Sequence, residues 1–192
     1  MLRKIIKYSF WGAIAYGLLF FPLFAEDTNT VFIPTEIPKE NWKEFTSADG
    51  HYSITFPGTP EHTNMVVKTK QGTSKIGRDI VPVDYGKEFS VAYFNYLGDT
   101  NKITLEQRLD TVRAGIATHP SWKLEYEKDF KFGNYPGRDF LFSIGEDKKI
   151  LNRMRIICGN ERGYQIQVIV HNGYFSSGDI KKFIKSFSIS EK

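Results

Sequence analysis

The sequence predicts an α+β protein, in which two helices pack on a largely antiparallel β-sheet of about six or seven strands. Three observations support this class. Much of the chain alternates apolar and polar residues with a period of two, which is typical of strands with one buried face. Short turns that contain glycine join several of these segments and predict hairpins. Two further segments have the apolar spacing of a helix.

The composition fits one globular domain. The 192 residues are 41% hydrophobic and 25% charged and include one cysteine, which argues against a disordered chain, a disulfide-built miniprotein and a multi-span membrane protein. The formal net charge of +4 comes mainly from Arg3, Lys4 and Lys7. Residues 26–192 hold 23 Lys and Arg against 22 Asp and Glu, so they lack the basic patch expected of a nucleic-acid-binding protein.

The N-terminus has the pattern of a secretory signal peptide. Residues 1–25 contain three basic residues, no acid and an apolar run from Tyr8 to Phe24, and Ala25-Glu26 is the predicted cleavage point. An uncleaved N-terminal anchor is the alternative, because the run approaches the length that spans a bilayer. Both alternatives predict an exported protein, periplasmic or extracellular, and the anchor adds membrane proximity through residues 1–25.

The exported part divides into a spacer and a domain. Residues 26–41 contain prolines and mixed charges without a helical or alternating period, so we interpret them as a spacer. The domain spans residues 42–192. Its first strands are predicted at residues 52–56, at residues 62–70 and 74–83, which form a hairpin across Gln71-Gly72, and at residues 87–97, after the turn Asp84-Tyr85-Gly86.

The first helix is predicted over residues 105–116. Thr104 and Gln107 form a capping box, in which each side chain accepts a hydrogen bond from the other residue's backbone N–H, and Leu105, Leu109, Val112 and Ile116 share one face. His119-Pro120 ends the helix.

The second half continues with strands and a C-terminal helix. Strands are predicted at residues 122–132, 140–144, 150–158 and 164–170, the last two as a hairpin. Near the C-terminus an apolar stripe lies opposite three lysines, which we interpret as a solvated helix face; the stripe is Ile180, Phe183, Ile184 and Phe187, and the lysines are Lys181, Lys182 and Lys185.

This order of elements resembles the PsbP-like family, and four stretches carry the resemblance. They are Trp42…Phe45…Ser47-Ala48-Asp49-Gly50…Tyr52-Ser53-Ile54…Phe56-Pro57-Gly58-Thr59-Pro60, Asn134-Tyr135-Pro136-Gly137-Arg138, Arg162-Gly163-Tyr164-Gln165 and Ile184…Ser186-Phe187. The resemblance covers roughly residues 42–190 and implies an α-β-α sandwich with an accessory or protein-binding role. It carries over no catalytic residue and no metal ligand.

A polar surface is the best candidate for binding. Arg153 and Arg155 alternate with core residues, and we expect them to share a sheet face with Asp139, Gln165 and Gln167. Arg138 follows the turn Gly133-Asn134-Tyr135-Pro136-Gly137, whose Tyr135-Pro136 bond is a candidate for the cis form. This turn is either a tight strand connection, which we favour, or an anion site built from N–H groups and Arg138.

Other reactive side chains predict no catalytic, metal or cofactor site. Glu125, Glu127 and Asp129 are expected on one side of a strand, where a solvated face is a simpler interpretation than a cation site. The histidines (His51, His62, His119 and His171) lack the spacing of metal ligands. Cys158 is predicted to be a buried, inert thiol.

The leading functional hypothesis is an exported, non-enzymatic accessory or interaction domain of the cell envelope, with a protein partner and no cofactor. The alternative is a small-ligand or lipid-binding protein that uses an apolar pocket between sheet and helix, and aromatic-rich strands motivate it. A third hypothesis, a hydrolase, requires His, Ser and carboxylate side chains to meet in one cleft.

Overall fold

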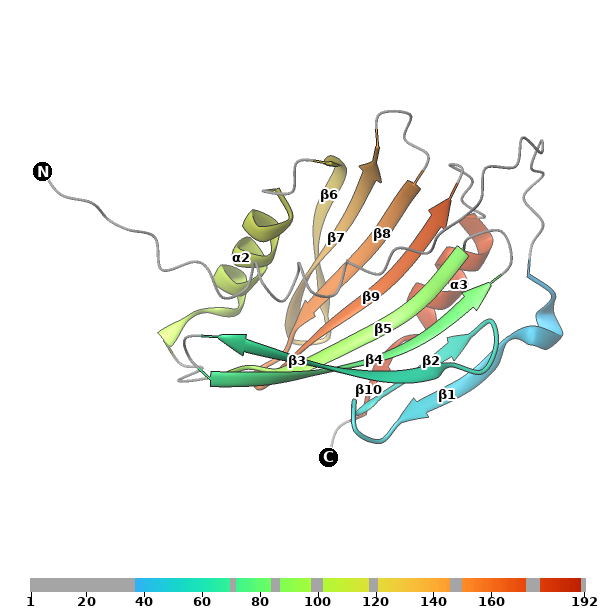
Figure 1. The fold of residues 1–192 in the computed structure, drawn as a ribbon, viewed down its shortest axis with the longest axis horizontal. Coiled ribbons are helices and arrows are strands. Elements are labelled where there is room, and N and C mark those ends of the chain that lie inside the picture. Colours follow the sequence, from blue (N-terminus) through green and yellow to red (C-terminus); the bar gives the residue numbers. More distant parts are fainter. Residues whose placement is uncertain are drawn as a thin grey trace, which may run out of the picture.

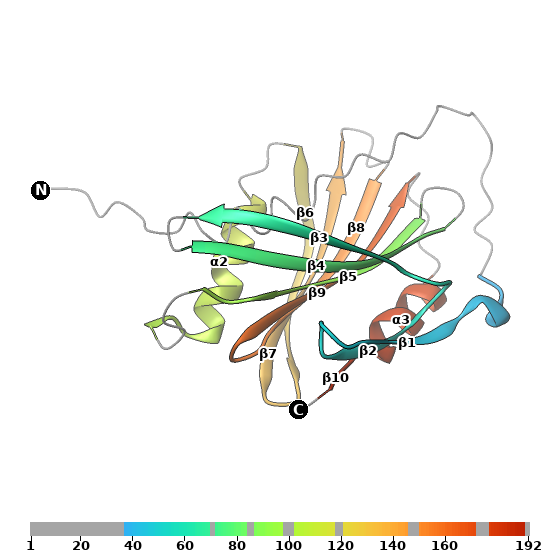
Figure 2. The same cartoon turned by 60° about the horizontal axis from the view of Figure 1, so that its bottom comes forward.

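A computed structural model describes residues 37–69, 72–83, 87–97, 102–117, 121–145, 150–171 and 177–190. Its main element is a seven-stranded sheet in which all neighbouring strands are antiparallel (Figure 1). In spatial order its strands are β3 (Glu61–Thr69), β4 (Gly72–Val83), β5 (Lys87–Asn95), β9 (Arg162–His171), β8 (Ile150–Cys158), β7 (Tyr135–Ile144) and β6 (Trp122–Phe132). The sheet twists strongly, so that β3 and β6 run in very different directions (Figure 2).

A second, three-stranded sheet lies beside the large one. It consists of β1 (Lys43–Ser47), β2 (Tyr52–Phe56) and β10 (Ser188–Ile189), in the order β1-β2-β10. The strand predicted at residues 52–56 is therefore present, but it belongs to this small sheet, and β1 and β10 are strands that the sequence did not predict. A 3₁₀ turn, η1 (Lys39–Asn41), precedes β1, and Ile37 packs in the core, so ordered structure includes the end of the predicted spacer.

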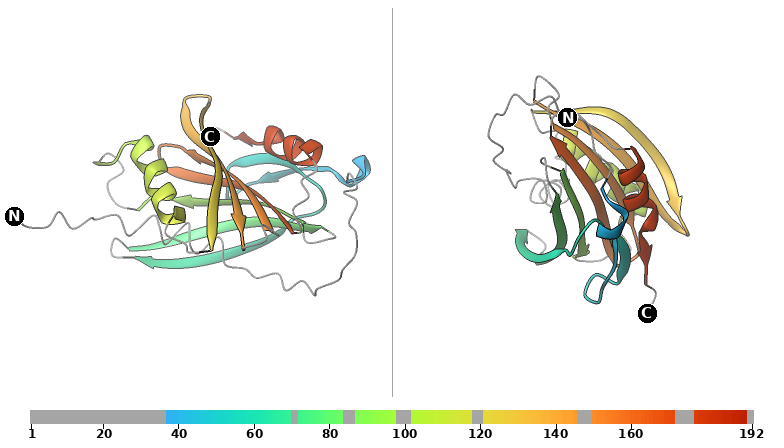
Figure 3. Two further views of the ribbon diagram at one scale, coloured as in Figure 1. Left: turned by 90° about the horizontal axis from the view of Figure 1, so that it is seen from above. Right: turned by 90° about the vertical axis from the view of Figure 1, so that its right-hand side faces the viewer.

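Two helices complete the fold and confirm the α+β class. The capping box of α2 (Leu105–Ala117) forms as predicted: the Thr104 N–H donates to Gln107 Oε1 at 2.9 Å, and the Gln107 N–H donates to Thr104 Oγ1 at 3.2 Å. The C-terminal helix, α3 (Ser177–Ser186), begins earlier than the apolar stripe indicated. It lies beside the small sheet, which Figure 3 shows in views from above and from the side.

The two faces of the large sheet bury separate apolar cores. On one face, here called the α2 face, Leu109 and Val112 of α2 pack against Phe140, Met154 and Ile156. On the other, the α3 face, Phe183 and Ile184 of α3 and the apolar residues of β2 pack against β5, β8 and β9. Because side chains alternate along a strand, neighbours such as Ile156 and Ile157 contribute to different cores.

A buried carboxylate ties the small sheet to the large one. The Tyr52 hydroxyl on β2 donates to Asp79 Oδ2 on β4 at 2.5 Å, and His62 Nδ1 lies 2.8 Å from Asp79 Oδ1. Burial and the hydrogen bond to Asp79 raise the pKa of Tyr52, so its hydroxyl stays a neutral donor. Both oxygens of the buried Asp79 therefore have partners.

Candidate functional site

The predicted cluster of Arg153, Arg155 and Asp139 is present on the α3 face. Asp139 on β7 is paired in register with Arg155 on β8. The Arg155 guanidinium makes two bonds to the carboxylate, Nε to Oδ1 at 2.7 Å and Nη2 to Oδ2 at 2.8 Å, and Arg153 Nη2 lies 3.4 Å from Oδ2. Such a two-bonded contact fixes the plane of the Arg155 guanidinium.

The expectation that Gln165 and Gln167 share this face is wrong. They are in register with Ile156 and Met154, and cross-strand partners project to the same side, so both amides lie on the α2 face. There they form a buried ladder: Gln165 Nε2 donates to Gln167 Oε1, and Gln167 Nε2 donates to Asn152 Oδ1, both at 3.1 Å. The ladder pairs the two glutamine amides with each other and with Asn152 Oδ1, and it does not extend the arginine cluster.

Further polar residues are buried on the same α2 face. The Arg78 guanidinium contacts the Glu88 carboxylate and donates to Ser90 Oγ at 3.2 Å. Burial raises the pKa of Glu88, although the neighbouring Arg78 opposes this shift. Sequence reasoning missed this pair, because Arg78 and Glu88 lie on different strands and nearly every position of β5 is buried, so polar alternation does not mark its faces.

Arg138 also lies on the α2 face, and carboxylates of this chain occupy its guanidinium. Its Nη1 lies 2.9 Å from Asp110 Oδ1 on α2 and 3.3 Å from Glu127 Oε1, and its Nε lies 2.5 Å from Asp129 Oδ1. Burial acts to lower the pKa of Arg138, but the hydrogen bonds and charges of Asp129 and Asp110 outweigh it and raise the pKa. Arg138 therefore fastens α2 to the sheet.

The turn before Arg138 is a strand connection. Gly133 has a φ of 56° at the first position of the two-residue loop between β6 and β7, as a type II′ hairpin turn requires. The structure has no cis peptide bond among the described residues, so Tyr135-Pro136 is trans and the expected cis form is wrong.

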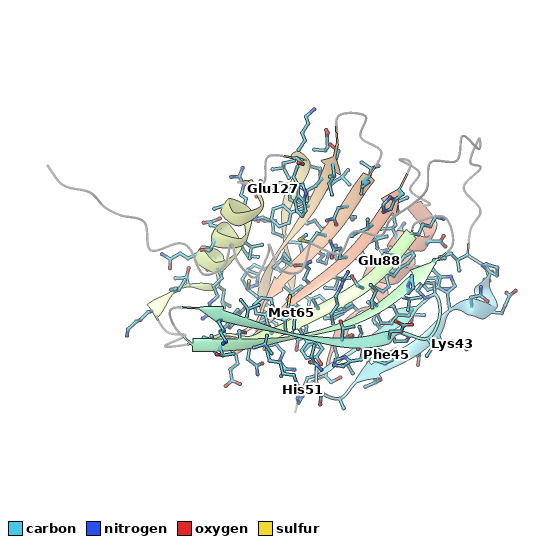
Figure 4. The ribbon with its side chains drawn as sticks, in the orientation of Figure 1. Lys43, Phe45, His51, Met65, Glu88 and Glu127 are labelled. Carbon is cyan, nitrogen blue, oxygen red and sulfur yellow. The ribbon has the colours of Figure 1, made fainter. Side chains whose placement is uncertain are left out.

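A β-bulge separates Glu125 from Glu127 and Asp129, which were all expected on one side of β6. The register shifts between Leu124 and Tyr126, which moves Glu125 to the side of Ser143, whose Oγ donates to it at 2.8 Å. Glu127, labelled in Figure 4 beside α2, binds Arg113 instead, at 2.7 Å. Among the described residues no group of three or more His, Cys, Asp or Glu is placed to hold a metal ion.

The remaining candidates are dispersed. His51 and His62 lie near the small sheet, and His171 lies at the end of β9. Cys158 is buried as predicted, and burial raises the pKa of its thiol to about 11, which keeps it protonated and inert. His119, Ala25 and Glu26 lie outside the described residues, as do the rest of residues 1–36 and the predicted turn at residues 84–86.

The arginine cluster forms one wall of a groove between α3 and the large sheet, here called the α3 groove. Its volume is about 310 Å³, and it is lined by Leu141, Arg153, Arg155, Ile180, Lys181, Ile184 and Lys185. Three aliphatic side chains supply the apolar surface, and four cationic side chains surround it. Asp139 is the carboxylate that pairs with these cations, since neither lysine forms an ion pair within the described part of the chain.

Aromatic rings on β6 support the two arginines. The Arg155 guanidinium lies 4.2 Å from the centre of the Phe130 ring, and that of Arg153 lies 5.3 Å from the centre of the Tyr126 ring. Tyr126 is 39% exposed, so the surface continues from the groove across β6. Arginine and tyrosine together are typical of the residues that dominate binding at protein interfaces.

The sequence missed the contribution of α3 to this surface. Lys181 and Lys185 are exposed, as expected of a solvated helix face, but they also line the groove beside Ile180 and Ile184. The available signal was the one-turn spacing of the two isoleucines and the two lysines, which places each pair along one line of the helix. Chemically, the groove suits a ligand with an apolar group flanked by negative charges.

Comparison with solved structures identifies the fold of the chain. The described sheet and helices match the solution structure of cyanobacterial PsbP (CyanoP) from Synechocystis sp. PCC 6803 with a TM-score of 0.55, covering 83% of this chain and 98% of that chain. The sequences are 8% identical, so the likeness shows a PsbP-like fold and nothing further. The resemblance in sequence thus correctly indicated the fold.

Other matches are weaker. The immunity protein TplEi of Pseudomonas aeruginosa in complex with a peptide matches with a TM-score of 0.43 at 9% identity, covering 81% of this chain and 100% of that chain. A protein of Bacteroides thetaiotaomicron matches with a TM-score of 0.44 at 14% identity, covering 79% of this chain and 50% of that chain. The chain matches no protein-family model and no curated protein sequence. Neither described helix is long and apolar enough to cross a membrane.

Proposed function

We propose that the protein is an exported, non-enzymatic accessory domain of the cell envelope, a PsbP-like α-β-α sandwich that binds an envelope protein through the α3 groove. The charge of the groove carries the proposal: four cationic side chains line it around an apolar floor, and Asp139, which pairs with the two arginines, is not among its lining residues. This arrangement complements a partner segment in which a large apolar side chain lies between Asp or Glu residues. The predicted signal of residues 1–25 supports the location.

The fixed position of Arg155 in the α3 groove favours the binding of a protein partner. Arg155 is held by two bonds to Asp139 and by the Phe130 ring, so it loses little conformational freedom on binding. The apolar floor gives an anchor side chain a place to be buried, and the cations steer an acidic segment toward it.

Charge reversal in the groove tests the proposal. The tagged full-length protein and the variant Lys181→Glu/Lys185→Glu are purified from native envelopes after crosslinking. Lys43→Glu, an exposed change on β1, is the matched control. We expect a partner that the wild type and the control retain and the double variant loses, with purified affinity reduced about tenfold or more and weakened by salt.

Two results contradict the proposal. If no envelope protein distinguishes the groove variant from the control, the groove is not the binding surface. If the purified chain hydrolyses model esters, glycosides or phosphates, the domain is an enzyme.

The groove also supports a second candidate, the binding of an amphiphilic carboxylate such as a fatty acid. Its volume of about 310 Å³ lies at the lower end of the range for small-molecule sites. Displacement of a fluorescent fatty acid, lost in Lys181→Glu/Lys185→Glu but retained in Lys43→Glu, would establish this ligand in place of a protein partner.

A further inference from the structure

A second cavity lies where the loop between β1 and β2 meets the large sheet, here called the loop pocket. Its volume is about 350 Å³, and it shares no lining residue with the α3 groove. Its polar side chains come from four strands and the loop: Asp49, His51, Asn64, Lys75, Asn95 and Arg162. His51 is labelled in Figure 4, where it lies at the edge of the molecule below β3 and β4.

Arg162 is held rigidly at this pocket. Its Nε donates to Asn95 Oδ1 at 2.8 Å, and its Nη1 donates to the backbone carbonyl of Asp49 at 2.5 Å. Its guanidinium also lies 5.4 Å from the centre of the Tyr93 ring. These contacts, together with a side-chain hydrogen bond to Tyr164, orient the guanidinium before any ligand binds.

Two positive charges of the pocket lack carboxylate partners. Within the described residues neither Arg162 nor Lys75 forms an ion pair, and Lys75 is exposed. Asp49 lines the same pocket and contacts Arg162 through its backbone, not through its carboxylate. The pocket thus offers two cations for an oxyanion and one carboxylate that accepts hydrogen bonds from hydroxyl groups.

The surrounding backbone is specialised to keep this arrangement. A Cβ on Gly77 would lie 2.2 Å from Cζ of Tyr93, so the absence of a side chain lets the Tyr93 ring lie against β4. His51 has a φ of 54°, a strained left-handed conformation for a residue other than glycine, and its carbonyl accepts the Ser190 N–H at 2.9 Å. Strain of this kind persists where the surrounding structure fixes it, and it clusters at ligand sites.

We propose that the loop pocket binds a small oxyanion that carries hydroxyl groups, the chemistry of a carboxylated or phosphorylated sugar. The oxyanion contacts Arg162 and Lys75, because these two cations line the pocket and form no ion pair within the described residues. The hydroxyl groups donate to Asp49 and exchange hydrogen bonds with Asn64 and His51. This inference goes beyond the proposed partner binding, and it does not depend on the α3 groove.

Calorimetric titration of the full-length protein tests the inference with four probes: glucuronate, glucose 1-phosphate, inorganic phosphate and glucose. We expect the two sugar anions to bind, phosphate to bind more weakly, and glucose not to bind. Lys75→Gln should weaken the sugar anions about tenfold, since it removes one charge-assisted hydrogen bond. Arg162→Lys should weaken them further, because lysine cannot reproduce the oriented guanidinium.

Two controls separate binding from folding. Lys68→Gln removes an exposed charge on β3 without touching the pocket, and Lys181→Glu/Lys185→Glu alters the α3 groove; both should bind the sugar anions like the wild type. Absence of saturable binding by both sugar anions, or binding that Lys75→Gln leaves unchanged, overturns the inference. Equal affinity for phosphate and the sugar anions overturns the acidic-sugar assignment.

Discussion

At the scale of single residues, burial of His171 couples stability to pH. The side chain is half-buried at the end of β9, and burial lowers its pKa. Just below the ordinary histidine pKa of 6.5, the unfolded chain therefore binds more protons than the folded one. The contribution of His171 to the free energy of unfolding is fully present above this pH range and is lost as the pH drops through it.

His171→Asn should reduce this loss. Urea denaturation at about pH 7.5 and about pH 5.5 gives the free energy of unfolding at both ends of the range. We expect a smaller decrease on acidification for His171→Asn than for the wild type. His51→Asn controls for the removal of a histidine, because asparagine tolerates the positive φ at that position. If both variants lose as much stability as the wild type, His171 does not contribute to acid sensitivity.

The burial and partners of a single residue were predictable where its neighbours in the sequence define its environment. Cys158 continues an apolar alternation and is buried, and Arg153 and Arg155 meet Asp139 across two adjacent strands. One partner of Arg138, Asp110, was not predictable, because it lies on a helix whose position over the sheet depends on the whole fold. Contacts between distant segments set the chemistry of the groove and of the loop pocket.

At the scale of elements, the capping box at the start of α2 has a measurable effect. Thr104→Ala removes the acceptor of the Gln107 N–H and should lower the free energy of unfolding by about 1 kcal/mol. Gln107→Glu keeps the reciprocal hydrogen bonds and adds a negative charge at the helix N-terminus, so it should equal or exceed the wild type. Chemical denaturation measures both. Equal stability of Thr104→Ala and the wild type would show that the cap contributes nothing here.

Most helices and strands were predictable, with β1 and β10 as exceptions, but the register of β6 was not. Its apolar residues occupy even positions from Trp122 to Phe132, which indicated one continuous face. The bulge between Leu124 and Tyr126 reverses the side, so that Trp122 packs in the α2-face core while Phe130 packs in the α3-face core. A bulge adds one residue to one strand, and simple alternation does not reveal it.

At the scale of the whole molecule, the central strands are buried on both faces. The sequence therefore does not show which of their side chains lie on which face of the sheet. Eight consecutive residues of β5 are buried, and β9 is nearly as covered. A strand covered on both sides shows little polar alternation, so the side that Gln165 and Gln167 occupy follows from pairing with β8 rather than from their own pattern. The sheet to which β2 belongs likewise follows from its pairing with β1 and β10, which its own alternation does not specify.

The two cores share their strands, so we expect them to unfold together. Each core contains a tryptophan that reports on it: Trp42 contacts Phe89 on the α3 face, and Trp122 contacts Phe142 on the α2 face. With Trp11 replaced by Phe, the variants Trp42→Phe and Trp122→Phe each leave one reporter. The fluorescence of either reporter should give the same unfolding midpoint as circular dichroism of that variant, as a two-state transition requires.

A mutation in one core provides the sharper version of this test. Phe183 is fully buried between Phe56 and Phe89, so Phe183→Ala should lower the free energy of unfolding by about 3–5 kcal/mol. Because α2-face and α3-face residues alternate along β5, β8 and β9, Trp122 should report this loss in full although it lies in the other core. A midpoint at Trp122 that stays at the parent value would show instead that the α2-face core unfolds as an independent unit.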